Sequence, residues 1–375
     1  MWITYFYRIS KQAYKTQRDI AYLMIRNTFL LCLLTISLSC FAQTTYEFSS
    51  ASPESKGFSS EKLDVLKQHL TESGSSSMII LVDGDIIFEW GETSKKHLVH
   101  SMRKAMLNSL YGIAIDRGQI DTTMTLRDLA INDIDKLTEK ELDATVADLL
   151  KSRSGVYHDA AAVNNAMLRD RPERGEYEAG AYYYYNNWDF NALGAILEQQ
   201  TGRSIYEMFY EEIAKPLGMS DYQGNYVSLE IDEEELQIPD TDGFYQYEKT
   251  QSNFPAYHFR MSTRDLALYG QLYNQYGEWN GEQLISKEWI DVSTQPYSVY
   301  SPQYGNAYGM LWRVRVPEEN TKRNSFFHTG LGIHMLGIYP DSGLVMVHRV
   351  NTEDDYEYQE RDFYQMIRLL FGSRI

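Results

Sequence analysis

Apolar positions along the chain predict strands near both of its ends. Residues 78–82 and 85–90 are short apolar runs separated by Asp83-Gly84, which is the sequence of a tight β-hairpin turn. Four more apolar or alternating runs occur toward the C-terminus, at residues 307–314, 325–329, 335–339 and 345–350. We expect the two groups of strands to share one antiparallel sheet.

Helical periodicity surrounds and interrupts these strands. Helices are predicted from Ser59 or Ser60 to Gly74, from Ser101 to Gly118 and over residues 356–371. Between the two groups of strands, residues about 119–295 show mostly helical patterns and long loops. The predicted fold class is therefore α/β of the α+β type, an antiparallel sheet flanked by N- and C-terminal helices, with an inserted, mostly helical subdomain.

Residues 1–42 are typical of a targeting segment whose translation starts too early. From Met24 the chain has a short basic region, an apolar run too short to span a bilayer, and a predicted cleavage site after Ala42. A competing interpretation makes Cys40 a lipid anchor, although Ser37 stands where the lipidation motif usually has Leu. We expect residues 43–57 to be a linker and residues 58–374 to form one domain that is exported, periplasmic or secreted, with no membrane span.

Composition disfavours several classes of function. The chain has 35 Lys and Arg against 52 Asp and Glu, and the first 42 residues are net basic, so the remainder is strongly acidic. Such a surface repels nucleic-acid phosphates and anionic lipid headgroups. Both cysteines, Cys32 and Cys40, lie in the targeting segment, and no two of the eight histidines have the HExxH zinc-ligand spacing. No metal or organic cofactor is predicted.

Ser101 and Lys104 have the spacing of a serine nucleophile and its base. Residues three apart on a helix share one face, so the Lys104 amine can reach the Ser101 hydroxyl. A serine in the first helical turn is also surrounded by unpaired backbone N–H groups that can hold an oxyanion. The spacing alone is ambiguous, because Ser59 and Lys62 share it, and there a helix cap with an exposed lysine explains it.

Two later motifs favour the interpretation of Ser101 as a nucleophile. Tyr185-Asn186-Asn187 precedes a predicted helix, and His328-Thr329-Gly330 ends a predicted strand. S-x-x-K, Y-x-N and K/H-T-G in this order resemble the serine β-lactamase and penicillin-binding-protein family, in its class C and DD-peptidase branch. The similarity covers residues 55–371. Within the family it is greatest to the esterase and 6-aminohexanoate-dimer-hydrolase-like members.

The resemblance implies a role for each motif residue. Ser101 attacks a carbonyl, and Lys104 and Tyr185 share the proton transfers, with a Lys104 cation stabilising any Tyr185 phenolate. Asn187 orients Lys104 and the substrate amide. The groove and its oxyanion hole are implied to involve His328, Thr329, Gly330 and the backbone N–H of Leu331. For Tyr157, a place in the substrate pocket and simple packing remain equally open.

The histidine of the third motif bears on the substrate. His328 stands where β-lactamases have lysine, and a histidine is mostly neutral at pH 7, which weakens the case for a β-lactam. The predicted function is a serine hydrolase that cleaves amide or ester bonds of a small molecule or peptide through an acyl-enzyme on Ser101. The alternatives are a D-alanyl-peptide hydrolase or class C-like β-lactamase, and a catalytically idle sensor or binding protein.

Overall fold

The computed structural model describes residues 45–231 and 236–375. The predicted targeting segment, with Cys32 and Cys40, lies outside the described residues. Residues 45–57, expected to be a linker, instead hydrogen-bond to the folded domain. The Ala51 amide donates to the Ile86 carbonyl at 3.0 Å, the Ile86 amide donates to the Ser49 carbonyl at 2.8 Å, and Tyr46 reaches the Gly218 carbonyl.

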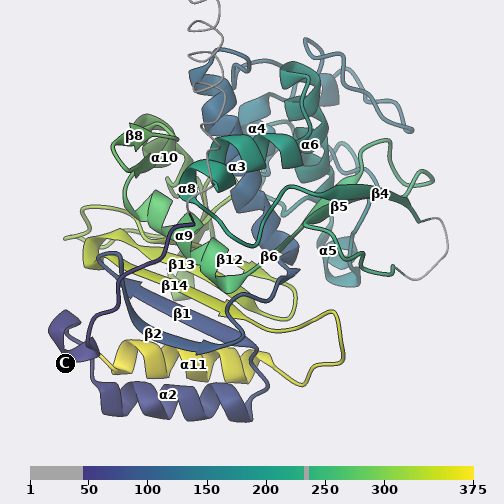
Figure 1. Ribbon diagram of the computed structural model, residues 1–375. Helices are drawn as coiled ribbons and strands as arrows, with labels where there is room; N and C mark the ends of the chain where they lie inside the picture. Colours follow the sequence, from purple (N-terminus) through teal and green to yellow (C-terminus); the bar gives the residue numbers. More distant parts are fainter. Residues whose placement is uncertain (1–44, 232–235) are drawn as a thin grey trace, which may run out of the picture. The chain divides into compact units, whose positions relative to one another are not determined.

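One large antiparallel sheet joins the two ends of the chain, as the apolar pattern predicts. Its strand order is β2-β1-β14-β13-β12-β11-β10-β9, so the N-terminal hairpin pairs directly with the last strand (Figure 1). The strands are β1 (Ser77–Val82), β2 (Asp85–Gly91), β9 (Ser298–Ser301), β10 (Asn306–Tyr308), β11 (Arg313–Arg315), β12 (Phe326–Gly330), β13 (His334–Tyr339) and β14 (Leu344–Arg349).

Residues 307–314, predicted as one strand, form two. Strands β10 and β11 are joined by a tight turn at Met310-Leu311, in which Leu311 has a φ of 62°. Both turn residues are buried, the Met310 carbonyl accepts from Asn108, and the Leu311 amide donates to the Leu150 carbonyl. Because this turn packs into the interior, its residues are apolar. At Met310-Leu311 the sequence therefore shows an apolar run in place of typical turn residues.

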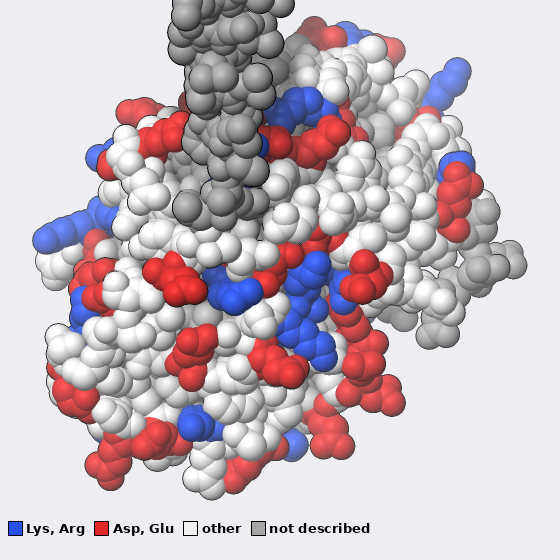
Figure 2. Space-filling model, in the orientation of Figure 1, with Lys and Arg blue, Asp and Glu red and all other residues white. Residues whose placement is uncertain are grey.

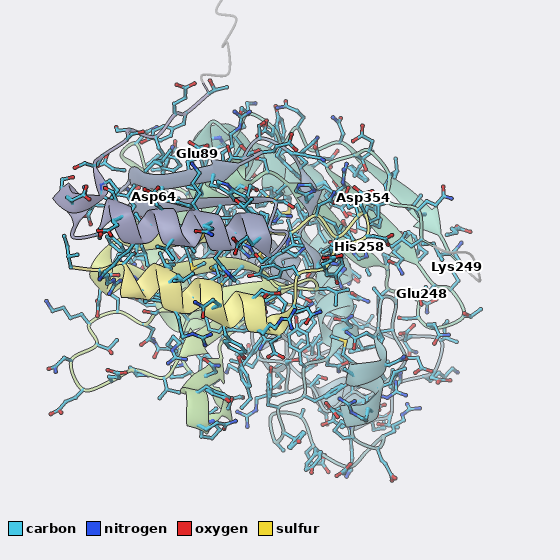
Figure 3. All side chains as sticks on the ribbon, turned by 90° about the horizontal axis from the view of Figure 1, so that it is seen from below. Asp64, Glu89, Glu248, Lys249, His258 and Asp354 are labelled. Atoms are coloured by element: carbon cyan, nitrogen blue, oxygen red, sulfur yellow. The ribbon has the colours of Figure 1, made fainter. Side chains whose placement is uncertain are left out.

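Helices cover both faces of the large sheet. Helices α2 (Ser60–Glu72) and α11 (Glu360–Gly372) lie side by side on one face, and α9 (Thr263–Asn274) packs on the other (Figures 1 and 3). Alternate residues of β1 therefore face two different apolar layers, Met78 and Ile80 toward α2 and α11, and Ile79 and Leu81 toward α9. This two-sided burial explains why β1 is apolar at every position.

Three strands of the region of residues 119–295, together with β3 from before it, form a second sheet that the pattern did not predict. Its order is β3-β6-β5-β4, with β4 and β5 parallel, and its strands are β3 (His97–Leu98), β4 (Tyr226–Glu230), β5 (Gly243–Tyr247) and β6 (Ala256–Met261). The small pair β7 (Glu278–Trp279) and β8 (Glu282–Gln283) also lies in this region. The expected mostly helical subdomain is thus a mixture of helices and strands.

The remaining helices build the part of the domain above the large sheet in Figure 1. They are α3 (Arg103–Asp116), α4 (Val146–Leu150), α5 (Asn165–Asp170), α6 (Asn187–Thr201), α7 (Ile205–Phe209), α8 (Lys215–Leu217) and α10 (Lys287–Ser293). A π-helical turn, η4 (Tyr210–Ala214), joins α7 to α8, and short 3-10 turns are η1 (Pro53–Lys56), η2 (His100–Met102), η3 (Glu141–Asp143), η5 (Pro302–Tyr304) and η6 (Pro340–Ser342).

The surface carries both signs of charge. On the face shown in Figure 2, basic side chains are interspersed with acidic ones. Among the helices of the described residues, none is long and apolar enough to cross a bilayer.

Asp133 joins its own loop and the loop of Ser252 and Asn253 to the start of α6 by hydrogen bonds. Its buried carboxylate accepts from the Trp188 indole N–H at 2.9 Å, from the Ser252 hydroxyl at 2.6 Å and from the Asn253 amide at 2.6 Å. Trp188 itself is fully buried in the second residue of α6. The carboxylate therefore holds the N-terminal turn of α6, which follows the Tyr185 motif.

We expect Asp133→Ala to lower the free energy of unfolding by about 3 kcal/mol, because it leaves buried donors without an acceptor. Urea denaturation measures the change. Asp135→Ala, at an exposed position in the same loop, is the matched control and should change stability by less than about 0.5 kcal/mol. Equal stabilities for the two variants would show that Asp133 does not fasten α6.

Candidate active site

Ser101 lies in the 3-10 turn η2, directly before helix α3. The helical segment thus begins one residue earlier than predicted, and the Ser101 hydroxyl does not cap it. The preceding residue, His100, has a φ of 49°, a left-handed conformation that costs a non-glycine residue about 1–2 kcal/mol. Such strain persists where surrounding contacts enforce it, and it is common at functional sites.

The other S-x-x-K pair differs in structure. Ser59 caps α2, with its hydroxyl oxygen accepting from the Lys62 amide at 3.3 Å. The Lys62 side chain is exposed and donates to the Gly372 carbonyl at 3.0 Å. Equal spacing thus gives a helix cap at Ser59 and a part-buried hydroxyl–amine pair at Ser101.

Lys104 is a buried amine beside Ser101. Its Nζ lies 3.3 Å from Ser101 Oγ, and the side chain is 1% exposed, with Nζ over the rings of Tyr185 and Phe190 at 4.9 and 4.5 Å. Burial, followed by the positive charges of Arg103 and Arg313, holds the pKa of Lys104 well below its usual value. A neutral amine at this distance can accept the proton of Ser101.

Tyr185 approaches the same pair from the loop before α6. Its hydroxyl is buried and has no hydrogen-bond partner of normal geometry among the described residues. Burial raises the pKa of Tyr185, while Arg313 and the nearby Ser101 hydroxyl oppose that rise. Both shifts favour the uncharged forms, a neutral amine and a neutral phenol, whereas the expectation was a Lys104 cation that stabilises a Tyr185 phenolate.

Asn187 does not orient Lys104 in this structure. Its amide Nδ2 donates to the Ala162 carbonyl at 2.6 Å, and its buried Oδ1 has no partner among the residues described. The neighbouring Asn186 caps α6 and donates to the Val156 carbonyl. Both amides are used to bind the N-terminal turn of α6 to the loop of residues 156–162, which explains the difference from the expected role.

The residues of the His328-Thr329-Gly330 motif do not all face the cleft. Thr329, Gly330 and Leu331 line the cleft, whereas His328 is fully buried and does not. The ring of His328 donates from Nδ1 to the Thr329 carbonyl at 2.9 Å. Burial, then Arg313 and Lys104, holds the pKa of His328 well below its usual value, so the imidazole is neutral.

Gly330 permits strand β12 to contact the turn η2, which contains Ser101. A Cβ at this position would lie 2.5 Å from the carbonyl oxygen of Val99, closer than any side chain tolerates. The backbone of residues 330–331 is thereby held beside that of residues 99–101. Strand β12 and the turn η2, distant in sequence, thus meet where the oxyanion hole was expected.

Tyr157 packs in the interior. It is 6% exposed, makes an edge contact with Tyr184 at 5.8 Å between ring centres, and does not line the cleft. Of the two interpretations left open by the sequence, the geometry matches packing.

The cleft contains residues that no sequence motif indicated. It has a volume of about 460 Å³, and besides the motif residues its lining includes Asn164, Ala166, Met167, Asp170, Tyr182 to Tyr184, and Arg313. Ser101 lies at this cleft, with the tyrosines and α5 on one side and Thr329 to Leu331 on the other. In the part of the chain described, no cluster of His, Cys, Asp or Glu has the arrangement of a metal site.

Arg313 brings a positive charge to the cleft. The half-buried guanidinium donates to the Tyr300 hydroxyl at 2.9 Å and lies 5.4 Å from the centre of the Tyr185 ring. Within the described ranges it has no carboxylate partner. Its alternation with Val314 and Arg315 is ordinary for a strand, so the sequence offered no signal for it.

Known proteins share this architecture. A relative from Escherichia coli O157:H7, provisionally named D-alanyl-D-alanine carboxypeptidase, is 23% identical over 78% of this chain and 81% of its own length. Relatives of the same provisional name from Salmonella strains are 26% identical, but the match spans only 53% of their length. Residues 67–370 match the family model described as Beta-lactamase.

Solved structures agree with these matches at the level of the fold. A Bacillus anthracis protein, provisionally titled a 6-aminohexanoate-dimer hydrolase, has a TM-score of 0.61 at 18% identity, covering 88% of this chain and 89% of that one. A penicillin-binding-protein homologue from Pyrococcus abyssi has a TM-score of 0.58 at 18% identity, covering 84% and 77%. The class of protein is a serine hydrolase, as the motifs predicted. The chain belongs to the beta-lactamase family.

The buried lysine leads to a prediction about stability. A lysine whose pKa is lower in the folded than in the unfolded protein destabilises the fold at any pH below its unfolded value, and the deficit vanishes as pH rises past that value. We therefore expect Lys104→Met to raise the free energy of unfolding at pH 7, with a smaller gain at pH 10, in urea denaturation.

Lys96→Met is the matched control. Lys96 forms an ion pair at 2.5 Å with the buried carboxylate of Asp242, so its replacement should lower stability at pH 7. A loss of stability in both variants would mean that Lys104 is not a destabilising buried amine.

Proposed function

We propose that the protein hydrolyses an amide or ester bond through an acyl-enzyme formed on Ser101. The observation that carries the proposal is the 3.3 Å separation of the Lys104 amine from Ser101 Oγ, in surroundings that lower the pKa of the amine. Lys104 takes the hydroxyl proton as Oγ attacks the substrate carbonyl. The backbone N–H groups of Ser101 and Leu331 would then hold the oxyanion.

Tyr185 completes the proton transfers in this proposal. When the tetrahedral intermediate collapses, the leaving amine or alkoxide must gain a proton. The Tyr185 phenol can donate it, and Lys104 returns the proton it took to the phenolate, which restores the neutral pair. Water then attacks the acyl group with Lys104 and Tyr185 as the base, releasing the acid and freeing Ser101.

The family and the provisional names of the relatives support bond classes of this kind. One relative is named for a peptide bond between D-alanines, and one structural neighbour for an amide dimer. A further neighbour, EstCE1, is described as a hydrolase with promiscuous acyltransferase activity. We propose a small molecule or peptide as the substrate, and an exported enzyme, with cleavage after Ala42 or a lipid anchor at Cys40.

We expect Ser101→Ala to abolish labelling by a fluorophosphonate and Lys104→Ala to lower kcat/KM for p-nitrophenyl esters by roughly 10³-fold or more. Ser59→Ala and Lys62→Ala, which alter the other S-x-x-K pair, are the matched controls and should keep full activity.

Each result has a distinct meaning. Substantial residual activity in Lys104→Ala would show that another group is the base. If neither the fluorophosphonate nor a fluorescent penicillin labels the wild-type protein under conditions that label a control enzyme, the idle binding protein is correct. Turnover of nitrocefin without ester turnover would favour a β-lactamase.

Arg313 favours a second, narrower candidate, the hydrolysis of peptides that end in a free carboxylate. His328 is neutral and buried, so the cation that β-lactamases place at that motif is missing from it. Arg313 supplies a positive charge to the same cleft from strand β11, and a guanidinium binds a carboxylate in a bidentate manner. This charge supports the D-alanyl-peptide hydrolase, which the sequence left open as an alternative.

We expect Arg313→Gln to raise KM for an N-acyl dipeptide with a free carboxylate by about 10- to 100-fold relative to its methyl ester, the loss of one charged hydrogen bond. The ratio of the two substrates cancels any effect of Arg313 on the pKa of Lys104. Arg315→Gln, two residues along the same strand and outside the cleft, is the control and should leave the ratio unchanged. An unchanged ratio in Arg313→Gln would exclude carboxylate recognition by Arg313.

A further inference from the structure

A line of hydrogen bonds runs from the interior to the residue before the nucleophile. Arg349 Nε donates to His334 Nδ1 at 3.0 Å, and His334 Nε2 lies 3.4 Å from Thr352 Oγ1. Thr352 Oγ1 in turn lies 2.8 Å from His100 Nε2. The imidazoles of His100 and His334 also contact each other, at 5.5 Å between ring centres.

The direction of these bonds follows from the arginine. A guanidinium only donates, so His334 Nδ1 must accept and its Nε2 carries the proton. That proton points to the Thr352 oxygen, which leaves the threonine hydroxyl to donate to His100 Nε2. Each imidazole therefore has one tautomer, and the threonine hydroxyl has one rotamer. Protonation of either imidazole would disrupt this line of hydrogen bonds.

The surroundings keep both imidazoles neutral. Burial, then the charge of Arg349, lowers the pKa of His100 to about 4 and holds that of His334 well below its usual value. Arg103 and Lys104 act on His100 in the same direction, and Glu353 acts against them. Near neutral pH both rings can therefore accept the hydrogen bonds that the line requires.

Arg349 also joins the two sheets at the point where the nucleophile turn begins. It is the last residue of β14, is fully buried, and donates to the carbonyls of Met261 in β6 and of His97 and Leu98 in β3. Strand β3 leads directly into η2, which contains Ser101. The Arg349 guanidinium thus holds strand β3, which precedes Ser101. Through the side chains of His334 and Thr352 it also reaches His100, the residue with the left-handed backbone conformation.

We propose that Arg349, His334, Thr352 and His100 form a positioning chain that fixes the direction of Ser101 Oγ without touching substrate. His100 has a strained conformation, and its imidazole is the group through which the chain holds it. None of the four lines the cleft, so they are positioning residues and not catalytic ones. The proposal rests on Ser101 being the nucleophile.

Thr352 is the member to test, because its two γ groups have separate contacts. Its hydroxyl links the imidazoles, whereas its methyl group packs against Gly332, where a Cβ would lie 2.2 Å from it. Thr352→Val keeps the methyl packing and removes the link. Thr352→Ser keeps the link and removes the packing.

We expect Thr352→Val to lower kcat for an ester, and the fluorophosphonate labelling rate of Ser101, by about tenfold or more, with KM changed less than about twofold. Thr352→Ser should retain activity within about twofold of wild type. A packing role alone would give the opposite ranking, with the valine variant active and the serine variant impaired, and would overturn the proposal.

A double-mutant cycle with His100→Gly gives an independent reading. Glycine adopts the same backbone conformation without strain but has no imidazole. If the chain acts through His100, Thr352→Val has no further effect on the labelling rate in the His100→Gly background. An equal loss in both backgrounds would overturn the chain. Absence of labelling in the wild-type protein would instead refute Ser101 as the nucleophile.

Discussion

The site depends on the burial of two neighbouring cationic side chains in the first turn of α3. Arg103 is 3% exposed and keeps its charge, because its guanidinium donates to the Tyr257 carbonyl at 2.6 Å and to Asn191 at 3.1 Å and lies over the Tyr257 ring. Lys104 has no such set of acceptors. The pKa of the lysine is therefore lowered, which favours its neutral, basic form.

A positive charge also affects pKa values on the other side of the cleft. Arg313 adds a second positive charge, which lowers the pKa of Lys104 and His328 and opposes the rise in that of Tyr185. A substrate carboxylate at Arg313 would neutralise part of this charge when it binds. Recognition and the proton affinities of the proposed catalytic pair are thus linked through one guanidinium.

Much of the fold and the proximity of Ser101 and Lys104 were predictable from the sequence, because both depend on local spacing. Periodicity indicated α2, α3 and the β1–β2 hairpin, and three short motifs in order indicated the family. Contacts between distant segments were not predictable. The use of Asn187 to bind a loop carbonyl, the burial of His328 and the place of Arg313 depend on packing between strands and loops far apart in the chain. The second sheet was missed because its buried strands β5 and β6 contain polar residues, Gln246, His258 and Arg260, so neither strand is a continuous apolar run like β1.

The pairing of β1 with β14 has a consequence for how the activity first arises. The strand that precedes the nucleophile is bound by the last residue of β14, and β1 itself pairs with β14 along its length. These contacts join residues more than 250 positions apart, so they form late and only after nearly the whole chain is available. A growing chain would therefore contain Ser101 and Lys104 before the contacts that surround them in the folded domain can form. The protein would thus be inactive, as a proenzyme is before activation, until its C-terminal strands have been added to the sheet.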